Sequence, residues 1–259
     1  MNWKAAVFVP AMGCLVVAGC QSSDPLPWRL IALGTTPLTT ALEDGQVVVA
    51  HAWNEGGAED ATGWPGMLFP TDTGQRNRQV MRDLRTLPTL TCGDVIRFSP
   101  SSIPLTLREH FGWTGKTADS ISVQWDCMDG IALGQWGMEA VAKAQDPTVA
   151  ESAFLASLMR WSPNQVQPPT SPYQLGDSIH LLIVTTRPDG QRVGDTVRLG
   201  FRKGQPDQVV PALEPGLASA GPGATWTVWS LSKDGFGSEA HPHLGLPAHT
   251  PLHFEVQAH

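Results

Sequence analysis

The sequence is poor in charge, and in positive charge above all. Only 16% of its 259 residues are charged, and 24 acidic residues against 17 basic ones give a formal net charge of −7. No block of Lys or Arg occurs along the chain. A protein that follows a phosphate backbone needs such a block, so we expect no nucleic acid partner.

Sequence signatures of common catalytic and cofactor sites are also missing. The chain has no serine or threonine nucleophile motif, no phosphate-binding P-loop and no glycine signature of a dinucleotide site. Four histidines lie close together, His241, His243, His249 and His253, and a His-x-His loop can bind zinc or nickel. No cysteine accompanies them, so we expect neither a metal ion nor another cofactor.

The apolar run at the N-terminus, Ala5 to Val17, is too short to cross a membrane as a helix. It follows Lys4 and leads to small residues, an order typical of a secretory signal. The sequence Val17-Ala18-Gly19-Cys20 resembles a bacterial lipobox, which implies that residues 1–19 are a lipoprotein signal peptide and that Cys20 is lipidated. An ordinary signal peptide with an incidental cysteine is the alternative.

A lipidated Cys20 would hold the protein in the cell envelope through a membrane anchor. Several acyl chains on one residue anchor a protein stably, where a single chain does not. Gln21 follows the cysteine, which by analogy with lipoproteins implies the outer membrane, facing the periplasm. We expect residues 20–40, rich in Ser, Pro, Thr and Leu, to form a tether, part of which can pack.

The remaining sequence favours a β-rich protein with two domains. It is rich in turn formers, with 26 Gly and 22 Pro, and short Val, Thr and Trp runs lie between the turns. A chain of 259 residues is long enough for two domains of ordinary size.

One helix is predicted between the two halves. Asp146 can cap it, Pro147 suits its first position, and Ser162-Pro163 ends it. One face carries Ala150, Phe154, Leu158 and Trp161. That face must pack against a domain, so residues 131–170 are interpreted as a helical joint, with an extended boundary segment at 163–172.

The C-terminal stretch, residues 208–259, has an order of elements that can be compared with a known family. An apolar pair and a proline-led helical turn are followed by a β-type run from Thr225 to Leu231, a Gly-Phe-Gly loop and a closing strand. This order resembles the C-terminal half of the FKBP-type peptidyl-prolyl isomerases, and Gly176 to Gly190 resembles the family's first long strand and hairpin. The resemblance implies an α+β fold over residues 171–259, a twisted antiparallel sheet wrapped around a short helix.

The family's pocket can be carried over residue by residue. Its positions correspond to Ile183, Val193, Val209, Val210, Leu213, Phe236 and Phe254. Val209, Val210 and Phe254 match the family pattern, whereas Ile183, Leu213 and Phe236 replace Tyr, Trp and Tyr. Val193 replaces Phe, and the carboxylate that follows in the family is present only one residue out of register, as Asp195.

These replacements keep the pocket apolar but remove its polar groups. The family's reaction is rotation about an Xaa-Pro bond, which an apolar pocket can favour without a nucleophile or metal. Tyr173, the only tyrosine, precedes the domain, so no pocket hydroxyl is expected. The resemblance therefore implies a slow isomerase with weak or absent macrolide binding.

The first half resembles the second more distantly. Gln79 to Phe98 can be aligned with Gln208 to Val228, and Asp119 to Cys127 takes the place of the closing strand. This favours an internal duplication with a diverged FKBP-like domain at residues 41–130, and chance similarity of short β patterns is the alternative. In the family fold, the strands that Cys92 opens and Cys127 ends are antiparallel neighbours, which implies a disulfide between them.

Three functions remain open from the sequence. The first is a prolyl isomerase acting on proline-containing segments of exported or unfolded chains, and the layout has a weaker similarity to the gliding-motility-type lipoprotein isomerases. The second is a non-catalytic chaperone or peptide-binding lipoprotein with the same fold. The third is a structural outer-membrane lipoprotein.

Overall fold

The structure is a computed structural model of residues 1–259. It describes residues 28–32, 34, 36–37, 41, 44–54, 65–69, 79–80, 82–83, 90–98, 121–169, 171–205 and 208–259. The predicted signal peptide and Cys20 lie outside these residues. The described part is α+β, with helices and antiparallel sheets, and none of its helices has the length and apolarity needed to cross a bilayer.

The first sheet has five antiparallel strands in the order β1-β6-β7-β3-β4. Their bounds are β1 (Trp28–Ala32), β3 (Val47–Asn54), β4 (Gly66–Leu68), β6 (Val95–Phe98) and β7 (Ile121–Met128). A separate pair joins β2 (Thr36–Pro37) to β5 (Thr91–Cys92). Part of the segment predicted as a tether thus forms strands, because β6 offers a free edge to which the backbone of β1 can pair.

The disulfide between Cys92 and Cys127 is present, as predicted. Their Cα atoms are 5.5 Å apart, and the bond joins β5 to β7. Beside it, the buried Asp94 accepts hydrogen bonds from the backbone N–H of Gly34 at 2.5 Å and of Thr91 at 2.6 Å. This corner of the first sheet is therefore held both covalently and by a buried carboxylate.

Two helices follow the first sheet, α4 (Gly130–Lys143) and α5 (Pro147–Trp161). The prediction for α5 is confirmed, since Asp146 accepts hydrogen bonds from the N–H groups of Thr148 and Val149. The prediction of a single helix is wrong, because α4 precedes it, capped by Asp129.

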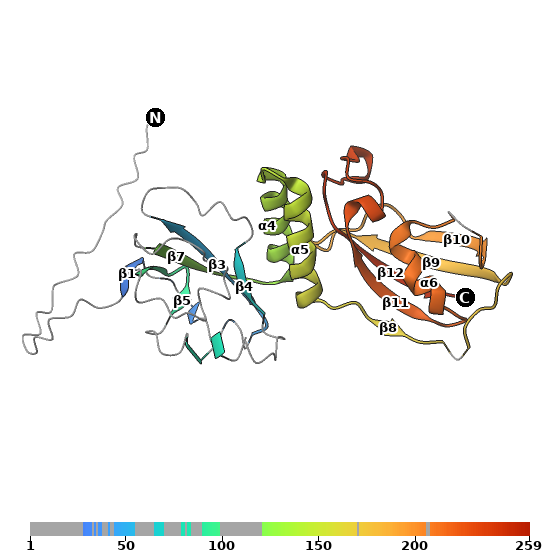
Figure 1. The fold of residues 1–259 in the computed structure, drawn as a ribbon, viewed down its shortest axis with the longest axis horizontal. Coiled ribbons are helices and arrows are strands. Elements are labelled where there is room, and N and C mark those ends of the chain that lie inside the picture. The colour runs from blue at the N-terminus through green and yellow to red at the C-terminus, as the bar shows by residue number, and fades with distance from the viewer. Residues whose placement is uncertain are drawn as a thin grey trace, which may run out of the picture.

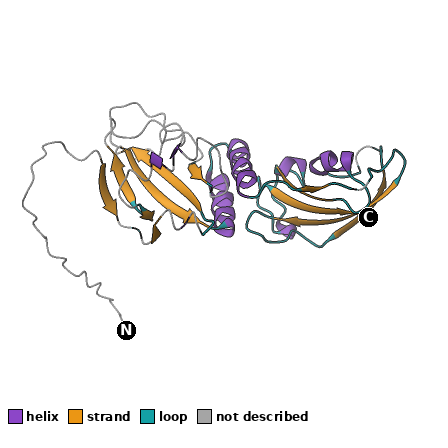
Figure 2. Cartoon of the chain, turned by 90° about the horizontal axis from the view of Figure 1, so that it is seen from below, coloured by secondary structure: helices purple, strands orange, loops and turns teal. Residues whose placement is uncertain are grey.

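The two helices lie between the sheets (Figures 1 and 2). Leu133 and Trp136 of α4 pack with Val47 and other core residues of the first sheet. The buried Phe154 and Leu158 of α5, two of the four residues predicted for its packed face, lie beside Trp229 of the second sheet. The helical pair therefore contributes to the packing of both halves.

Two glycines of α4 permit close approach. A Cβ atom at Gly134 would lie 2.2 Å from the carbonyl oxygen of Pro188, in the turn after the first long strand of the second sheet. A Cβ atom at Gly137 would lie 2.0 Å from the ring of Phe154 on α5. Both separations are far below van der Waals contact, so any side chain here would displace backbone or a buried ring.

The second sheet also has five antiparallel strands, in the order β10-β9-β12-β11-β8. Their bounds are β8 (Val166–Gln167), β9 (Ser178–Thr186), β10 (Val197–Arg202), β11 (Thr225–Ser230) and β12 (Leu252–Ala258). β8 lies inside the segment predicted as an extended boundary, and it pairs with Thr225 and Trp226 of β11. The second sheet thus begins before residue 171.

Short helices complete this half of the chain: η1 (Pro211–Leu213), α6 (Glu214–Ser219), η2 (Ser232–Asp234) and η3 (Pro242–Leu244). Pro215 falls in the first turn of α6, where a missing N–H costs nothing. The short helix therefore forms despite the proline, as the sequence allowed.

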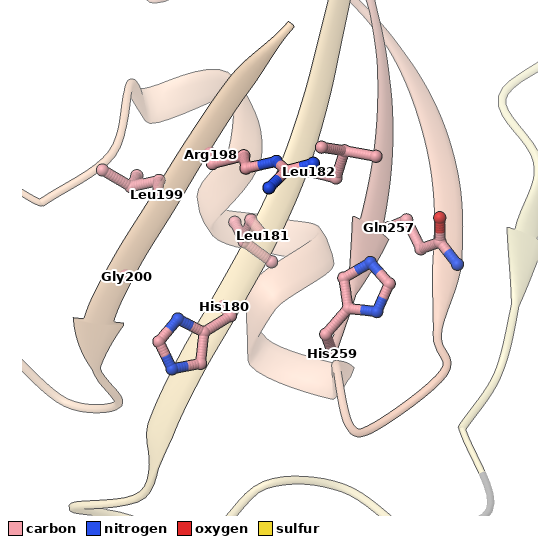
Figure 3. A pocket seen from close by; sticks show the side chains of 8 residues that line it. All are labelled: His180, Leu181, Leu182, Arg198, Leu199, Gly200, Gln257 and His259. Carbon is pink, nitrogen blue, oxygen red and sulfur yellow. The ribbon is translucent and has the colours of Figure 1, made fainter.

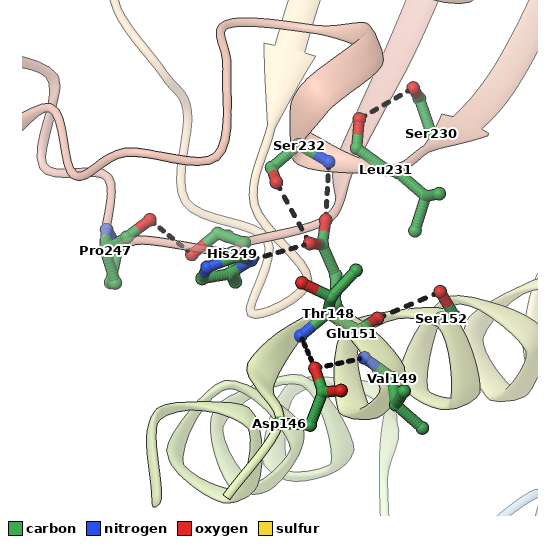
Figure 4. A network of polar contacts seen from close by, with 11 residues as sticks. Asp146, Thr148, Val149, Glu151, Ser152, Ser230, Leu231, Ser232, Pro247 and His249 are labelled. Atoms are coloured by element: carbon green, nitrogen blue, oxygen red, sulfur yellow. Dashed lines mark hydrogen bonds and ion pairs between the residues drawn. The ribbon is translucent and has the colours of Figure 1, made fainter. Parts of the chain in front are cut away.

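A buried carboxylate joins α5 to the loops of the second half (Figure 4). Glu151 is 2% exposed and accepts hydrogen bonds from Ser232, through its backbone N–H at 2.5 Å and its hydroxyl at 3.0 Å. His249 Nδ1 lies 3.3 Å from the same carboxylate. The backbone φ of His249 is +52°, a left-handed conformation that residues other than glycine seldom adopt. This junction therefore fixes a strained loop residue against the helix.

Candidate apolar site

The predicted pocket residues gather on one face of the second sheet. Alternation along β9 and β12 turns Ile183 and Phe254 to the inner face, where both are buried. Val193 and Leu213 are buried in the same cluster, and Val209 and Val210 are packed against it. Six of the seven residues are thus brought together. We call these six residues, together with Phe236, the apolar site.

The seventh residue, Phe236, lies at the edge of that cluster. Its ring centroid is 6.4 Å from that of Phe254, and it is 37% exposed. The neighbouring His241 Nε2 lies 2.8 Å from the carbonyl oxygen of Phe236 and so helps to fix the loop. Phe236 is therefore the member of the apolar site that solvent reaches most readily.

The helical turn η1 and α6 form the other wall. Val210 precedes η1 with an extended backbone, Pro211 begins the turn, and Leu213 N–H donates to the Val210 carbonyl at 3.0 Å. Leu213 thereby points into the cluster and is 1% exposed. The sequence Val-Val-Pro thus places two half-buried valines directly before a helical turn.

An aromatic surface that the sequence reading missed is provided by Trp226. Leu213 replaces the aromatic residue that the family resemblance leads one to expect, but Trp226 of β11 lies in the same cluster and is 5% exposed. Its indole packs against Gly216 of α6. Within the described residues, no hydrogen-bond partner is found for its Nε1. Only the alternation of β11 could have indicated that Trp226 points inward.

Tyr173 belongs to the domain core, contrary to the expectation that it precedes the domain. It is 8% exposed, and its hydroxyl donates to the backbone oxygen of His259 at 2.6 Å. Burial raises the pKa of Tyr173 above its ordinary value, and the charge of Asp177 adds to the rise. The hydroxyl is therefore occupied in joining two distant parts of the chain.

The buried carboxylate near the β9–β10 turn is Asp189, not Asp195, which is exposed. Burial raises the pKa of Asp189, but hydrogen bonds from Arg187 and from backbone N–H groups, with the Arg187 charge, outweigh it and lower the pKa overall. Arg187 pairs with Asp189 and also donates to the Gly245 carbonyl at 2.6 Å. This carboxylate therefore holds a turn and a loop together.

The C-terminal histidines do not form one group. His241 and His243 have ring centroids 5.9 Å apart, while His253 lies against Trp229, with centroids 4.6 Å apart. Burial lowers the pKa of His253 below its ordinary value, with Glu255 acting weakly in the opposite direction. In the parts of the chain that the structure describes, no three His, Cys, Asp or Glu side chains are grouped as a metal ion would require.

Two open hollows lie on the second sheet, of about 540 and 390 Å³. Neither is lined by a residue of the apolar site. Leu182 and Gln257, which line both hollows, alternate with buried residues along β9 and β12 and so face outward. Leu181, Trp226 and Val256 of the buried cluster also line the hollows, from within the sheet. The hollows therefore lie on the face of the sheet opposite the apolar site.

Comparisons with known proteins add little to these observations. No protein-family model and no curated protein matches the chain. Among solved structures, it is similar to a peptidyl-prolyl cis-trans isomerase of Pseudomonas syringae pv. tomato str. DC3000, with 22% sequence identity and a TM-score of 0.34. The similarity covers 47% of this chain and 92% of that one. What this protein does must therefore be inferred from its own residues.

Proposed function

We propose that the second half of the chain is an FKBP-type peptidyl-prolyl isomerase that acts on proline-containing segments of exported or unfolded polypeptides. The observation that carries the proposal is the gathering of six predicted pocket residues in one apolar cluster beside η1 and α6, with Phe236 at its exposed edge. Rotation about the Xaa-Pro bond requires loss of amide resonance, and the twisted amide is less polar than the planar one. Apolar surroundings therefore favour the twisted amide over the planar one.

The activity should be slow, because the polar groups near the apolar site already have partners within the protein. The only tyrosine hydroxyl is already bonded to His259, and the buried Asp189 is bonded to Arg187, so neither group is free to orient a substrate carbonyl. Loss of one oriented hydrogen bond costs about 1 to 3 kcal/mol, or about one to two decades in rate. Catalysis would remain measurable against an uncatalysed step of about tens of seconds.

The proposal predicts a loss of activity when the apolar site is altered. Phe236→Ala should lower the isomerisation rate of a short Xaa-Pro peptide about tenfold, equivalent to about 1.4 kcal/mol in the barrier. Val210→Asp should abolish it by bringing charge and water into the cluster. NMR exchange spectroscopy measures the rate, and circular dichroism checks the fold.

Matched controls lie on exposed positions away from the apolar site. Leu175→Ala, at a residue 84% exposed, and Val149→Asp on α5, at a residue 64% exposed, should leave the rate unchanged. A protein that leaves the peptide's exchange rate unchanged would refute the isomerase. If that protein still binds the peptide, a non-catalytic chaperone or peptide-binding function takes its place. The burial of Leu213 and Phe254, at 1% and 2% exposed, favours this second candidate.

We further propose that the first half is a diverged copy of the second. Numbered along the chain within each half, the strands of both sheets follow the same spatial order, 1-4-5-2-3, with antiparallel neighbours throughout. The central strands β7 and β12 occupy equivalent places in this order. Chance similarity of short β patterns would not give both halves the same strand order. The shared order therefore favours a duplication over chance.

Attachment to a membrane in the cell envelope is proposed from the sequence, through acylated Cys20. Mass spectrometry of protein extracted from the outer membrane should find a mature chain that begins at Cys20 and carries acyl groups. A mature chain beginning elsewhere, or an unmodified Cys20, would contradict the anchor. It would leave the isomerase proposal untouched.

A further inference from the structure

The outer face of the second sheet carries a hollow whose side chains suit a negatively charged ligand. The hollow, of about 540 Å³, lies over β10, β9 and the end of β12. Arg198, His180 and His259 line it, and the Arg198 side chain extends from β10 toward Leu182 of β9 (Figure 3). Strand register explains the grouping, because Arg198 is opposite Leu182 and His180 is opposite Gly200. Glycine at position 200 makes room for the His180 ring, whose Nδ1 lies 3.1 Å from where a Cβ atom would be.

The basic side chains of this hollow have no partner elsewhere in the part of the chain that the structure describes. Arg198, His180 and His259 are exposed, and within the described residues no ion pair or side-chain hydrogen bond is found for any of them. An Arg beside an apolar surface is suited to carboxylate binding, since its guanidinium can donate two parallel hydrogen bonds. The hollow therefore combines an unneutralised charge with an apolar floor.

A second hollow continues from the first across the sheet. It shares Leu182 and Gln257 with the first. It reaches β11 through Thr225 and Thr227 and β8 through Val166 and Gln167. From β10 to β11 the two hollows span three strand spacings, or about 14 Å, which an extended segment of about four residues would cover. Glu255 lines the second hollow. An acidic group would therefore be accepted at the Arg198 end and repelled at the other.

We infer that these hollows bind an extended segment of a partner polypeptide, with a carboxylate at Arg198 and neutral or apolar residues toward β11. Charge favours this occupant over the surface of an anionic membrane, which is attracted by clusters of four or more Lys and Arg. Here one Arg stands beside two histidines, on a chain of net charge −7. The site faces away from the apolar site, so this inference does not rest on the proposed isomerase.

The test uses the full chain and a fluorescent octapeptide of alternating Gln and Leu in which one terminal Gln is replaced by Glu, called the Glu-Leu peptide, with the unsubstituted Gln-Leu peptide as the neutral control. Fluorescence anisotropy at low ionic strength should show the Glu-Leu peptide binding about tenfold or more tightly than the Gln-Leu peptide. Arg198→Gln should remove that difference. Lys143→Gln should retain it, because Lys143 is an exposed cation on α4 that does not line the hollow.

Two further measurements keep the inference falsifiable. Leu182→Glu places a carboxylate on the floor and should abolish Glu-Leu binding without affecting the inner core, since Leu182 faces outward. Vesicles containing phosphatidylglycerol should not bind the protein through Arg198. Equal affinity for both peptides, an unchanged affinity in Arg198→Gln, or Arg198-dependent binding of vesicles but not of peptide would each overturn the inference.

Discussion

Replacing Cys92 and Cys127 together by serine is expected to lower the free energy of unfolding of the first half by about 3 to 4 kcal/mol in the chain-entropy model. The bond closes a loop with a sequence separation of 35 residues, and its loss restores conformational freedom to the unfolded chain. Chemical denaturation followed by tryptophan fluorescence measures the change, because Trp125 of β7 is fully buried in this half.

Reduction gives a control for the substitution itself. Dithiothreitol should destabilise the wild-type protein by a similar amount and should leave the double serine variant unchanged. The effect should be local, since Asp94 still holds Gly34 and Thr91 by hydrogen bonds and α5 packs on the other half. Alkylation of both Cys92 and Cys127 in protein that has not been reduced would contradict the bond.

Removing the carboxylate of Glu151 is expected to cost about 3 kcal/mol, the effect of breaking a buried charged contact by deleting one partner. In Glu151→Ala, the N–H and hydroxyl of Ser232 lose their acceptor. Ser232 is only 3% exposed, so water cannot readily replace the carboxylate. His249, held in a left-handed backbone conformation, loses its contact with the helix. In chemical denaturation of the full-length variant, the second half should unfold at a lower denaturant concentration than it does in the wild-type protein.

An exposed glutamate on the neighbouring helix provides the matched control. Glu139 pairs with Lys143 one turn away, and both side chains are more than 70% exposed, so Glu139→Ala should change stability by less than about 0.5 kcal/mol. Equal effects of the two substitutions would mean that the Glu151 junction contributes nothing. Glu151→Gln, which keeps the shape and loses the charge, should fall between them.

Local signals in the sequence were sufficient for some elements and insufficient for others. Asp146, Pro147 and Ser162-Pro163 predicted α5 because caps and breakers act on their own segment. The sequence did not predict α4, because its three glycines, Gly130, Gly134 and Gly137, lower helix propensity. The structure shows why the last two are there, since each allows a close contact that only the folded protein reveals.

The candidate site shows the same division. The family resemblance brought together residues from β9, the Val-Val-Pro turn and β12, and the structure places six of them in one cluster. It gave no indication that Trp226 would supply an aromatic surface or that Tyr173 would bond to His259, because both depend on which distant strands become neighbours. The sequence likewise did not indicate that Asp189 is buried instead of Asp195, because this depends on the contacts of Arg187 with Asp189 and with the loop at Gly245.

The place of β12 in the second sheet has a consequence for the order in which the protein can fold as it is synthesised. Residues 252–258 come last among the strands but lie between β9 and β11, and they are the partner that joins the β10–β9 hairpin to the β11–β8 pair. Until these residues leave the ribosome, the second half can form only two ribbons with open edges. Because isolated two-stranded ribbons are marginally stable, the chain must be kept apart from other copies until its final strand arrives.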